Sequence, residues 1–244
     1  MDGTIYLEDK MIDGAVETLN YLIEKKKHIL FVTNKTTQTK DEYAKFLNNN
    51  GVIISLDNIL TAASNCVSYL KKERSGKKFY AIAEDIFIDS IKDAGLVFTT
   101  NPDEIEIIII SLDRKYSKAK FKIAKNALLK GAEFLAANID NTCPVIEGEI
   151  VDAGIVISDL EKETGKKLKQ HFGKPSEFMI STIKNNLKYS VDNYLLIGDR
   201  LETDILMGSL IGMDTVLVNS GVFNSINNGD NSPTYNTTSI KELL

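Results

Sequence analysis

The sequence predicts an α/β fold in which a core domain is interrupted by an inserted α/β domain. Short apolar runs typical of buried strands alternate with stretches of helical period, a pattern that favours parallel sheets covered by helices. Two breaks containing Gly and Lys, at residues 75–77 and 164–167, interrupt this alternation, which resumes after each one. We find no internal repeat. The simplest division assigns residues 1–70 and 171–244 to the core and residues 71–170 to the insertion.

A helix, a strand and two further helices are expected before the first break. Residues 13–27 place apolar side chains on one stripe and glutamates on the opposite side, which predicts an amphipathic helix. Residues 28–32 form a largely apolar run, which predicts a buried parallel strand. Residues 39–50 are again amphipathic and end at an Asn-Gly pair suited to a left-handed cap. Another helix is expected at about 62–73.

The same reasoning predicts alternating strands and helices after the first break. The isoleucine run at 107–110 is the clearest strand, because β-branched side chains suit a pleated, buried surface. The insertion is expected to contain strands at 79–83, 105–111 and 132–137 and helices at 86–94, 117–130 and 153–164. After the second break, strands are expected at 194–197 and 215–218 and a helix at 203–211.

The composition is that of an ordinary globular protein. Of its 244 residues, 43% are hydrophobic and 26% are charged, which excludes disordered and collagen-like chains. No apolar run is long enough to span a bilayer, and the N-terminus lacks the pattern of a secretory signal, so we expect a cytoplasmic protein without a membrane partner. A net charge of −5 argues against binding to nucleic acid. Cys66 and Cys143 lie in unrelated contexts and are expected to stay reduced.

Four short polar motifs carry the candidate chemistry, and three of them stand where an apolar strand ends or should have ended. Ligands of open α/β sheets collect beyond the carboxyl ends of the strands, so these motifs can converge on one crevice. In the last motif two carboxylates could face a single hard cation, since Mg²⁺ keeps several waters and needs only two or three protein oxygens. The motifs are Asp2-Gly3-Thr4, Thr33-Asn34, Lys174 within residues 172–175, and Gly198-Asp199 followed by Asp204.

Each motif alone also has a simpler structural explanation. Asp-Gly is a common tight turn, Thr-Asn after a strand is often a helix N-cap, and Gly-Lys-Pro is typical of a surface turn. Asp199 or Asp204 could equally cap the following helix. We expect structural roles for the two histidines, His28 and His171.

Taken together and in this order, the four motifs resemble the haloacid dehalogenase-like (HAD) phosphatase superfamily, and most closely its subfamily IIA, the 4-nitrophenylphosphatase and ribonucleotide monophosphatase type. Other segments resemble the core helices of that family, its large cap and its C-terminal closure: residues 14–22, 60–64, 131–140, 148, 153–154 and 233–235. The resemblance therefore covers essentially the whole chain. It implies a three-layer, flavodoxin-like core with an inserted α/β cap that closes over the site.

The resemblance implies phosphoryl transfer through an aspartyl-phosphate, with Asp2 as general acid and base. By motif position, Thr33 would hydrogen-bond a phosphoryl oxygen and Asn34 would lie beside it. Lys174 would set its charge against the phosphoryl oxygens and the nucleophile. The implied catalytic residues are thus Asp2, Thr33 and Lys174.

The resemblance also implies a Mg²⁺ site and a substrate-binding cap. Asp199 would bind the ion directly, Asp204 would be a second ligand or bind through water, and the backbone carbonyl of Asp2 would complete the metal set. In the cap, three polar side chains could face the leaving group or could instead be turn residues that satisfy local backbone. These cap residues are Asn138, Asp140 and Asp152.

The first motif departs from the family pattern, which is Asp-x-Asp-Gly-Thr after a hydrophobic strand. Met1 stands at the x position, so the nucleophile would precede it. We expect the polypeptide to begin further upstream, because a parallel sheet without its middle strand would expose two rows of unpaired backbone groups. Two alternatives are a literal start, which gives an inactive or poorly folded chain, and a chain in which Asp2 itself is the nucleophile and Thr4 takes the acid position.

The function expected is hydrolysis of a small phosphate monoester by a Mg²⁺-dependent enzyme. Nucleotides, sugar phosphates and phosphoglycolate-like acids are the candidate substrates. A catalytically inactive protein that binds a phosphate ligand is the alternative from another class, and a phosphotransferase or mutase is a third. The oligomeric state stays open, although an exposed cap face could pair two chains as a homodimer.

Overall fold

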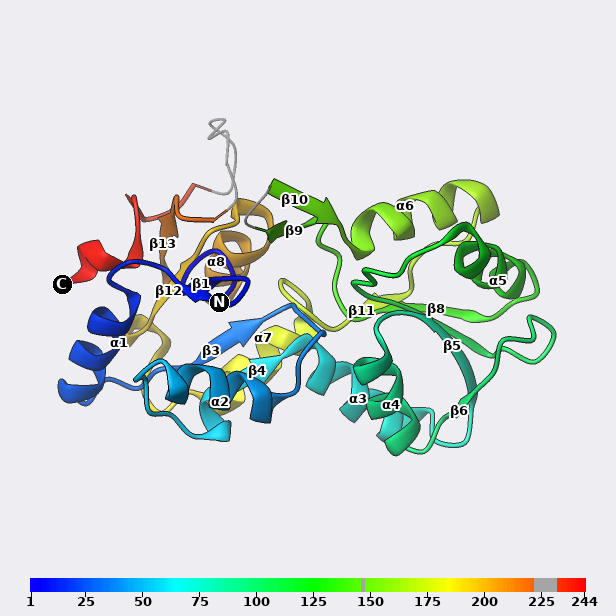
Figure 1. Ribbon diagram of the computed structural model, residues 1–244, viewed down its shortest axis with the longest axis horizontal. Helices are drawn as coiled ribbons and strands as arrows, with labels where there is room; N and C mark the ends of the chain where they lie inside the picture. The colour runs from blue at the N-terminus through cyan, green and yellow to red at the C-terminus, as the bar shows by residue number, and fades with distance from the viewer. Residues whose placement is uncertain (146–147, 222–231) are drawn as a thin grey trace.

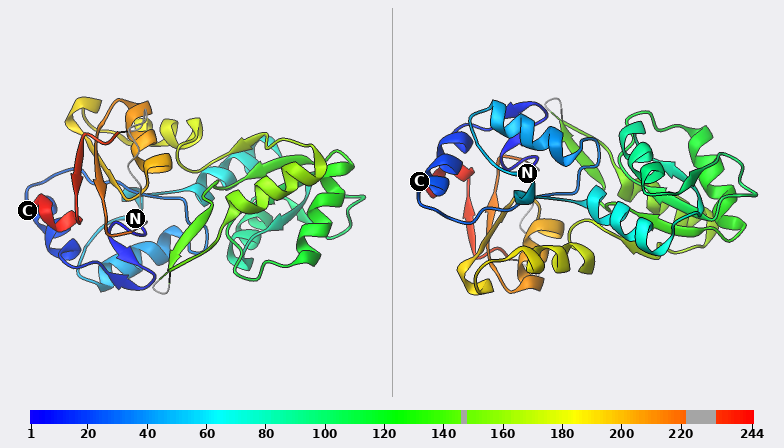
Figure 2. Two further views of the ribbon diagram at one scale, coloured as in Figure 1. Left: turned by 90° about the horizontal axis from the view of Figure 1, so that it is seen from above. Right: turned by 90° about the horizontal axis from the view of Figure 1, so that it is seen from below.

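The protein forms two lobes, one built from both ends of the chain and the other from its middle (Figures 1 and 2). A computed structural model describes residues 1–145, 148–221 and 232–244. Both termini lie in the same lobe. The limits proposed for the two domains stay a prediction.

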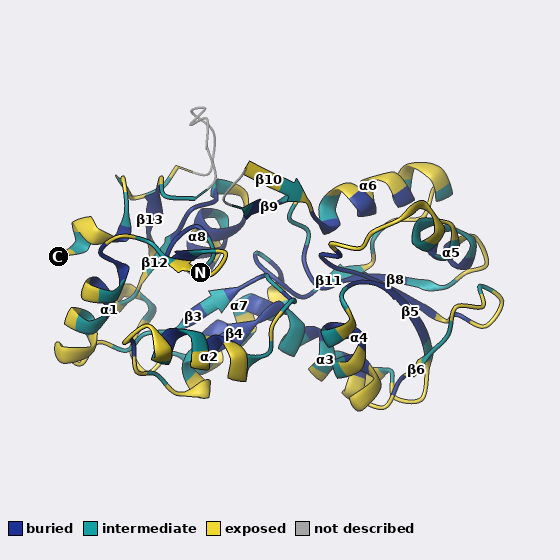
Figure 3. Cartoon of the chain, in the orientation of Figure 1, coloured by how far each residue is buried: buried dark blue, intermediate teal, exposed yellow. Residues whose placement is uncertain are grey.

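The middle lobe contains a five-stranded parallel sheet in the order β11-β8-β7-β5-β6. Its strands are β5 (Lys78–Ile82), β6 (Val97–Phe98), β7 (Ile107–Ile110), β8 (Glu133–Ala136) and β11 (Gln170–His171). Its helices are α4 (Asp85–Asp93), α5 (Lys118–Leu129) and α6 (Ala153–Thr164). Figure 3 shows buried strands and exposed outer faces of the helices.

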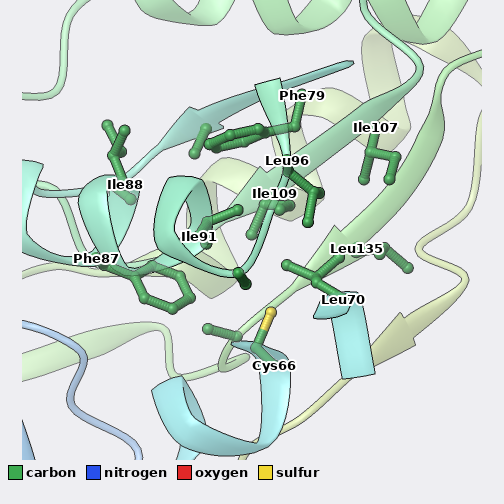
Figure 4. Close-up of a cluster of buried hydrophobic side chains, with 14 of the residues drawn as sticks. Cys66, Leu70, Phe79, Phe87, Ile88, Ile91, Leu96, Ile107, Ile109 and Leu135 are labelled. Atoms are coloured by element: carbon green, nitrogen blue, oxygen red, sulfur yellow. The ribbon is translucent and has the colours of Figure 1, made fainter. Parts of the chain in front are cut away.

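Strand β7 explains how this sheet is covered on both faces. Ile107 and Ile109 pack into one apolar cluster, whereas Ile108 and Ile110 pack into another. Successive side chains of a strand point to opposite faces, so a continuous apolar run buries both of them. The first cluster also includes Cys66 from helix α3 (Ala62–Glu73), which therefore contributes to the packing of the middle lobe (Figure 4).

The strands of the terminal lobe form two separate parallel sheets. Strand β3 (Phe31–Thr33) pairs with β4 (Ile59–Thr61), and β12 (Leu195–Gly198), β13 (Asp214–Val218) and β14 (Tyr235–Thr237) form the other sheet. The covering helices are α1 (Ala15–Glu24), α2 (Lys40–Asn49), α7 (Glu177–Asn186) and α8 (Leu206–Ile211). Two antiparallel hairpins complete the fold: β1 (Tyr6–Leu7) with β2 (Lys10–Met11), and β9 (Thr142–Val145) with β10 (Gly148–Val151).

A cavity of about 800 Å³ separates the two sheets of the terminal lobe. Its lining includes Val32 of β3 and Leu196 of β12, together with apolar side chains from the helices such as Leu19 and Met207. In the described part of the chain, neither facing edge is paired with another strand. The amino group of Met1 reaches the Val32 carbonyl at 3.4 Å. The lobe thus has the helical layers of an α/β fold around a sheet that is interrupted at its middle.

Most elements lie where the sequence predicts them. Helices α3 and α6 match the expected ranges, and helix α1 is shorter than the range of 13–27. The strand expected at 28–32 begins only at Phe31. Among the residues that the structure describes, no helix is long and apolar enough to cross a membrane.

Candidate active site

The predicted site residues from three motifs meet at one end of the terminal lobe. Thr33 closes strand β3, Asp199 follows the last residue of β12, and Lys174 comes three residues after β11. These residues and Asp2 line one small cavity of about 50 Å³. Parallel strands bring their carboxyl ends to one edge, which is why residues far apart in the sequence converge here.

Lys174 and Asp204 form a buried ion pair at the floor of this cavity. Lys174 Nζ lies 2.5 Å from Asp204 Oδ1, and the backbone N–H of Arg200 donates to Asp204 Oδ2 at 3.3 Å. Burial alone would lower the pKa of Lys174, but the Asp204 carboxylate outweighs it and raises that pKa. Burial alone would raise the pKa of Asp204, and the Lys174 charge holds it below its usual value. Both groups are therefore charged at neutral pH.

The Asp2-Gly3-Thr4 turn packs directly against Asp199. Thr4 Oγ1 donates a hydrogen bond to Asp199 Oδ1 at 3.3 Å. Gly3 has a φ of 76°, and a Cβ atom there would lie 2.3 Å from Asp199 Oδ2, so only glycine fits. Asp2 Oδ2 accepts from Lys35 Nζ at 2.6 Å, whereas Asp2 Oδ1 is buried without a partner.

Asn34 joins the terminal lobe to the loop that follows β8. Its Oδ1 accepts from the Lys174 backbone N–H at 2.6 Å, and its Nδ2 donates to the Lys174 carbonyl at 3.2 Å and to Asp140 Oδ2 at 3.0 Å. The Thr33 hydroxyl accepts from the Lys35 backbone N–H at 3.2 Å. Asn34 therefore holds the loops that carry Lys174 and Asp140 in a common arrangement.

Two predicted polar residues of the middle lobe, Asp140 and Asp152, line the small cavity, whereas buried Asn138 bonds to both without lining it. Asn138 Nδ2 donates to Asp140 Oδ2 at 3.2 Å and to Asp152 Oδ1 at 3.1 Å. Asp152 also accepts from the Ala153 backbone N–H at 2.5 Å, which makes it the N-cap of helix α6. Asp152 therefore caps a helix and also lines the cavity.

The donor groups of the cavity suit a hard cation, although no complete metal cluster is formed. In the described part of the chain, no group of three or more His, Cys, Asp and Glu side chains converges closely enough to hold a metal ion. Asp2, Asp199 and Asp204 nevertheless line the same cavity, and the buried Asp2 Oδ1 has no partner. An all-oxygen set is what Mg²⁺ prefers, with backbone carbonyls and waters as the remaining ligands. The residues present therefore fit Mg²⁺.

The structure adds two cations that the motif analysis does not name. Lys35 pairs with Asp2, and buried Arg200 donates from Nη2 to the Thr142 carbonyl at 2.7 Å. Both line the small cavity. Lys35 directly follows Asn34, and Arg200 directly follows Asp199. The residues next to each motif in the sequence were therefore the clue that could have pointed to these two cations.

The two histidines lie outside the lining of the small cavity. His28 Nδ1 lies 2.8 Å from the Tyr194 hydroxyl oxygen, which joins the loop before β3 to the loop before β12. Burial lowers the pKa of His171.

A larger cleft of about 960 Å³ lies between the lobes next to the small cavity. Its lining mixes polar and apolar side chains from the loops after β3 and β7 and from the β9–β10 hairpin. A cleft of this size accommodates a small organic molecule. The small cavity and the cleft together form a site with a charged end and a roomier end.

Comparisons with known proteins agree with this architecture. Residues 1–97 match the family model described as haloacid dehalogenase-like hydrolase, and residues 171–243 match a second, HAD-hydrolase-like model. In sequence, the chain is 30% identical over 246 residues to an acid sugar phosphatase from Staphylococcus haemolyticus, covering 100% of this chain and 91% of that protein.

Solved structures extend the likeness to the fold. A p-nitrophenyl phosphatase from Archaeoglobus fulgidus superposes with a TM-score of 0.85 at 28% identity, covering 99% of this chain and 95% of that one. A 4-nitrophenylphosphatase from Thermotoga maritima superposes with a TM-score of 0.86 at 26% identity, covering 100% of this chain and 93% of that one. The predicted α/β fold is therefore confirmed.

Proposed function

The chain belongs to the haloacid dehalogenase-like hydrolases, and from this premise we propose that it is a magnesium-dependent phosphatase that hydrolyses a small phosphate monoester through an aspartyl-phosphate. The family predicted from the four motifs is thus confirmed. Relatives matched over nearly their whole length are named as phosphatases, which supports a phosphoric monoester hydrolase. The observation that carries the proposal is the single cavity shared by Asp2, Thr33, Lys174 and Asp199.

In the proposed reaction, a carboxylate nucleophile attacks phosphorus in line and expels the alkoxide. Asp2 protonates the alkoxide and then accepts a proton from the water that cleaves the aspartyl-phosphate. The free Oδ1 of Asp2, buried in the cavity, supports this role. Lys174 stabilises charge on the phosphoryl oxygens, and the Thr33 hydroxyl donates to one of them.

We propose that Asp199 and the Asp2 carbonyl hold Mg²⁺, with Asp204 acting through water. Both oxygens of Asp204 are occupied by Lys174 and Arg200, which favours the water-mediated contact. When bound, the ion neutralises charge on the transferring phosphoryl group.

In the family's first motif, the nucleophile stands two residues before the aspartate that corresponds to Asp2. The second candidate is a protein that binds a phosphate ligand but does not catalyse its hydrolysis, and one observation favours it. Lys35, Lys174 and Arg200 line the same cavity, so cations surround the position of an anion.

The test compares the chain as printed with a variant that carries an apolar strand and an Asp directly before Met1. We expect the extended variant to hydrolyse 4-nitrophenyl phosphate with Mg²⁺ and to lose this activity with a chelator. Absence of hydrolysis of any phosphate ester by that variant contradicts the enzyme proposal. Saturable binding without turnover heat, measured by calorimetric titration of both chains, supports the binder instead.

We further propose a small phosphorylated metabolite as the binding partner and the cytoplasm as the location. Both cysteines are buried and free of disulfides, as expected in a reducing compartment.

A further inference from the structure

Three side chains line both the small phosphate cavity and the larger cleft: Lys35, Cys143 and Asp152. They therefore line the passage that joins the small cavity, proposed to bind the phosphoryl group, to the larger cleft, where the leaving group would lie. Lys35 is already paired with Asp2 through its Nζ. Burial raises the pKa of the Cys143 thiol to about 12, so Cys143 is neutral and only a weak hydrogen-bond donor. Asp152 is the strongest polar group left to meet a leaving group.

The orientation of Asp152 is set by its neighbours. Its Oδ1 accepts from the Ala153 N–H at 2.5 Å and from Asn138 Nδ2 at 3.1 Å. Its Oδ2 has no hydrogen-bond partner among the residues that the structure describes. Asp152 is only 6% exposed, but Oδ2 is not one of the fully buried atoms without a partner, so it stays open to a hydrogen bond with water or with a ligand.

The charges around Asp152 favour its neutral form. Burial and the nearby Asp140 carboxylate raise its pKa to about 7, against the hydrogen bonds from Ala153 and Asn138 and the positive charge of Arg200. With Oδ1 occupied by two donors, the proton belongs on Oδ2. A neutral carboxyl group can then donate from Oδ2, as well as accept.

The cleft beyond Asp152 disfavours an acidic leaving group. Its ionisable lining includes four acidic side chains, of which Asp152 is the one with a raised pKa, and two strong bases: Glu8, Asp9, Asp113, Asp152, Lys35 and Arg114. Both bases are engaged, since Lys35 pairs with Asp2 and Arg114 pairs with Glu84. A second anionic group on the substrate would therefore find no free cation in this lining, whereas a hydroxyl group would find donors and acceptors.

We propose that Asp152 is a specificity-determining residue whose Oδ2 forms a hydrogen bond with a hydroxyl group of the leaving group. This inference rests on the proposed function, and it selects phosphate esters of polyols and sugars over phosphorylated acids. Asp152 takes no part in breaking the P–O bond.

The experiment measures binding of a matched pair of esters to the full chain with Mg²⁺. Glycerol 3-phosphate and n-propyl phosphate carry the same phosphomonoester group and differ in their hydroxyl groups. A phosphorus NMR titration gives both dissociation constants and reveals any hydrolysis. The variants are Asp152→Asn, which keeps a donor and the helix cap, and Asp152→Ala, which removes the donor. Asp159→Asn, on the exposed face of α6, is the control.

We expect the unaltered chain to prefer glycerol 3-phosphate at pH 6 by about fivefold, the effect of one net hydrogen bond. This preference should persist as pH rises from 6 to 8, because the ionised carboxylate of Asp152 accepts a hydrogen bond from the same hydroxyl group. Asp152→Asn should keep the preference at both pH values, Asp152→Ala should lose it at both, and Asp159→Asn should follow the unaltered chain.

An equal, pH-independent preference in the unaltered chain and Asp152→Ala overturns the inference while leaving the proposed function intact. Failure of both esters and inorganic phosphate to bind at either pH contradicts the proposed phosphate site, and the inference falls with it. The two failures are therefore distinguishable.

Discussion

Among single residues, Lys174 makes the interaction at the site whose loss we expect to cost the most stability. Replacing it with methionine, Lys174→Met, keeps the apolar volume of the side chain but leaves the Asp204 carboxylate buried and unpaired. Removing one partner of a buried ion pair costs roughly 3–5 kcal/mol of unfolding free energy. Urea titration at pH 7 measures this loss. The cost should shrink as pH falls from 7 towards about 4, because the unpaired, buried Asp204 takes up a proton well above the pKa of an exposed aspartate.

An exposed ion pair provides the control for Lys174. Lys241 Nζ lies 2.8 Å from Asp13 Oδ2 on the surface. Water screens such pairs, so Lys241→Met should leave the unfolding midpoint unchanged. Equal effects of the two substitutions would show that the Lys174 pair is not buried as the structure has it.

Asp152 should make the stability of the fold depend on pH. Its pKa is raised to about 7 in the folded chain, against about 3.9 for an unperturbed aspartate. The folded state therefore holds more protons between these values, and stability falls as pH rises from about 4 to about 7.

The variant Asp152→Asn removes that titration while it preserves the cap of helix α6. Its unfolding free energy relative to the unaltered chain should rise with pH by at most about 1.4 kcal/mol per unit between pH 4 and pH 7. Denaturant titrations over this range measure the slope. A difference that stays constant with pH would mean that Asp152 is already ionised.

Sequence reasoning brought together the residues of the small cavity because each follows a strand or precedes one. Asp2, Thr33 and Asp199 could be placed from this pattern alone. Lys35 and Arg200 could not, because their importance depends on which carboxylates lie across the cavity. The raised pKa of Asp152 was equally out of reach, since its burial and the approach of Asp140 arise only from the tertiary packing of the folded chain.

At the scale of elements, helix α2 shows how hydrogen bonds between neighbouring residues fix the point where a helix begins. Thr39 accepts a hydrogen bond from the Glu42 N–H, and the Glu42 carboxylate accepts from the Thr39 N–H, which forms a capping box. Thr39→Ala should cost about 1 kcal/mol of unfolding free energy. Thr100→Ala, an exposed loop substitution, should change the urea midpoint very little. Equal midpoints for both variants would contradict the importance of the cap.

Several short elements could not be predicted from the sequence, and the reason is physical. Strand β4 has three residues and the β1–β2 hairpin has two-residue strands. These strands are too short to show the alternation of apolar and polar side chains that predicts a strand. Helix α7 was missed although it has ten residues, because only Met179 and Ile183 of it are buried. Long amphipathic helices such as α3 were predicted with correct limits.

At the scale of the whole molecule, the two lobes should differ in local stability. The parallel sheet of the middle lobe is continuous and buried on both faces, whereas β3 and β12 face a cavity of about 800 Å³. Hydrogen exchange should therefore be faster for amides of β3 and β12 than for those of β5 and β7, since protection follows packing and pairing. Uniform protection across all four strands would contradict this difference.

The sequence could predict that the chain has an interrupted core, because the breaks near residues 75 and 164 are visible in it. It could not predict the size of the passage between the lobes or the cavity between the sheets. Those features depend on how complete lobes pack, which no local pattern contains.

The cavity between β3 and β12 predicts how the molecule can be stabilised. A segment of about five apolar residues joined ahead of Met1 would lie parallel to both strands, pair with their free edges and bury apolar surface now facing the cavity. We expect such a variant to unfold at a higher temperature than the chain as printed. A segment of the same length made of Gly and Ser should leave the melting temperature nearly unchanged, because it fills no apolar volume. Equal melting temperatures for the two extended chains would show that the cavity does not accept a strand.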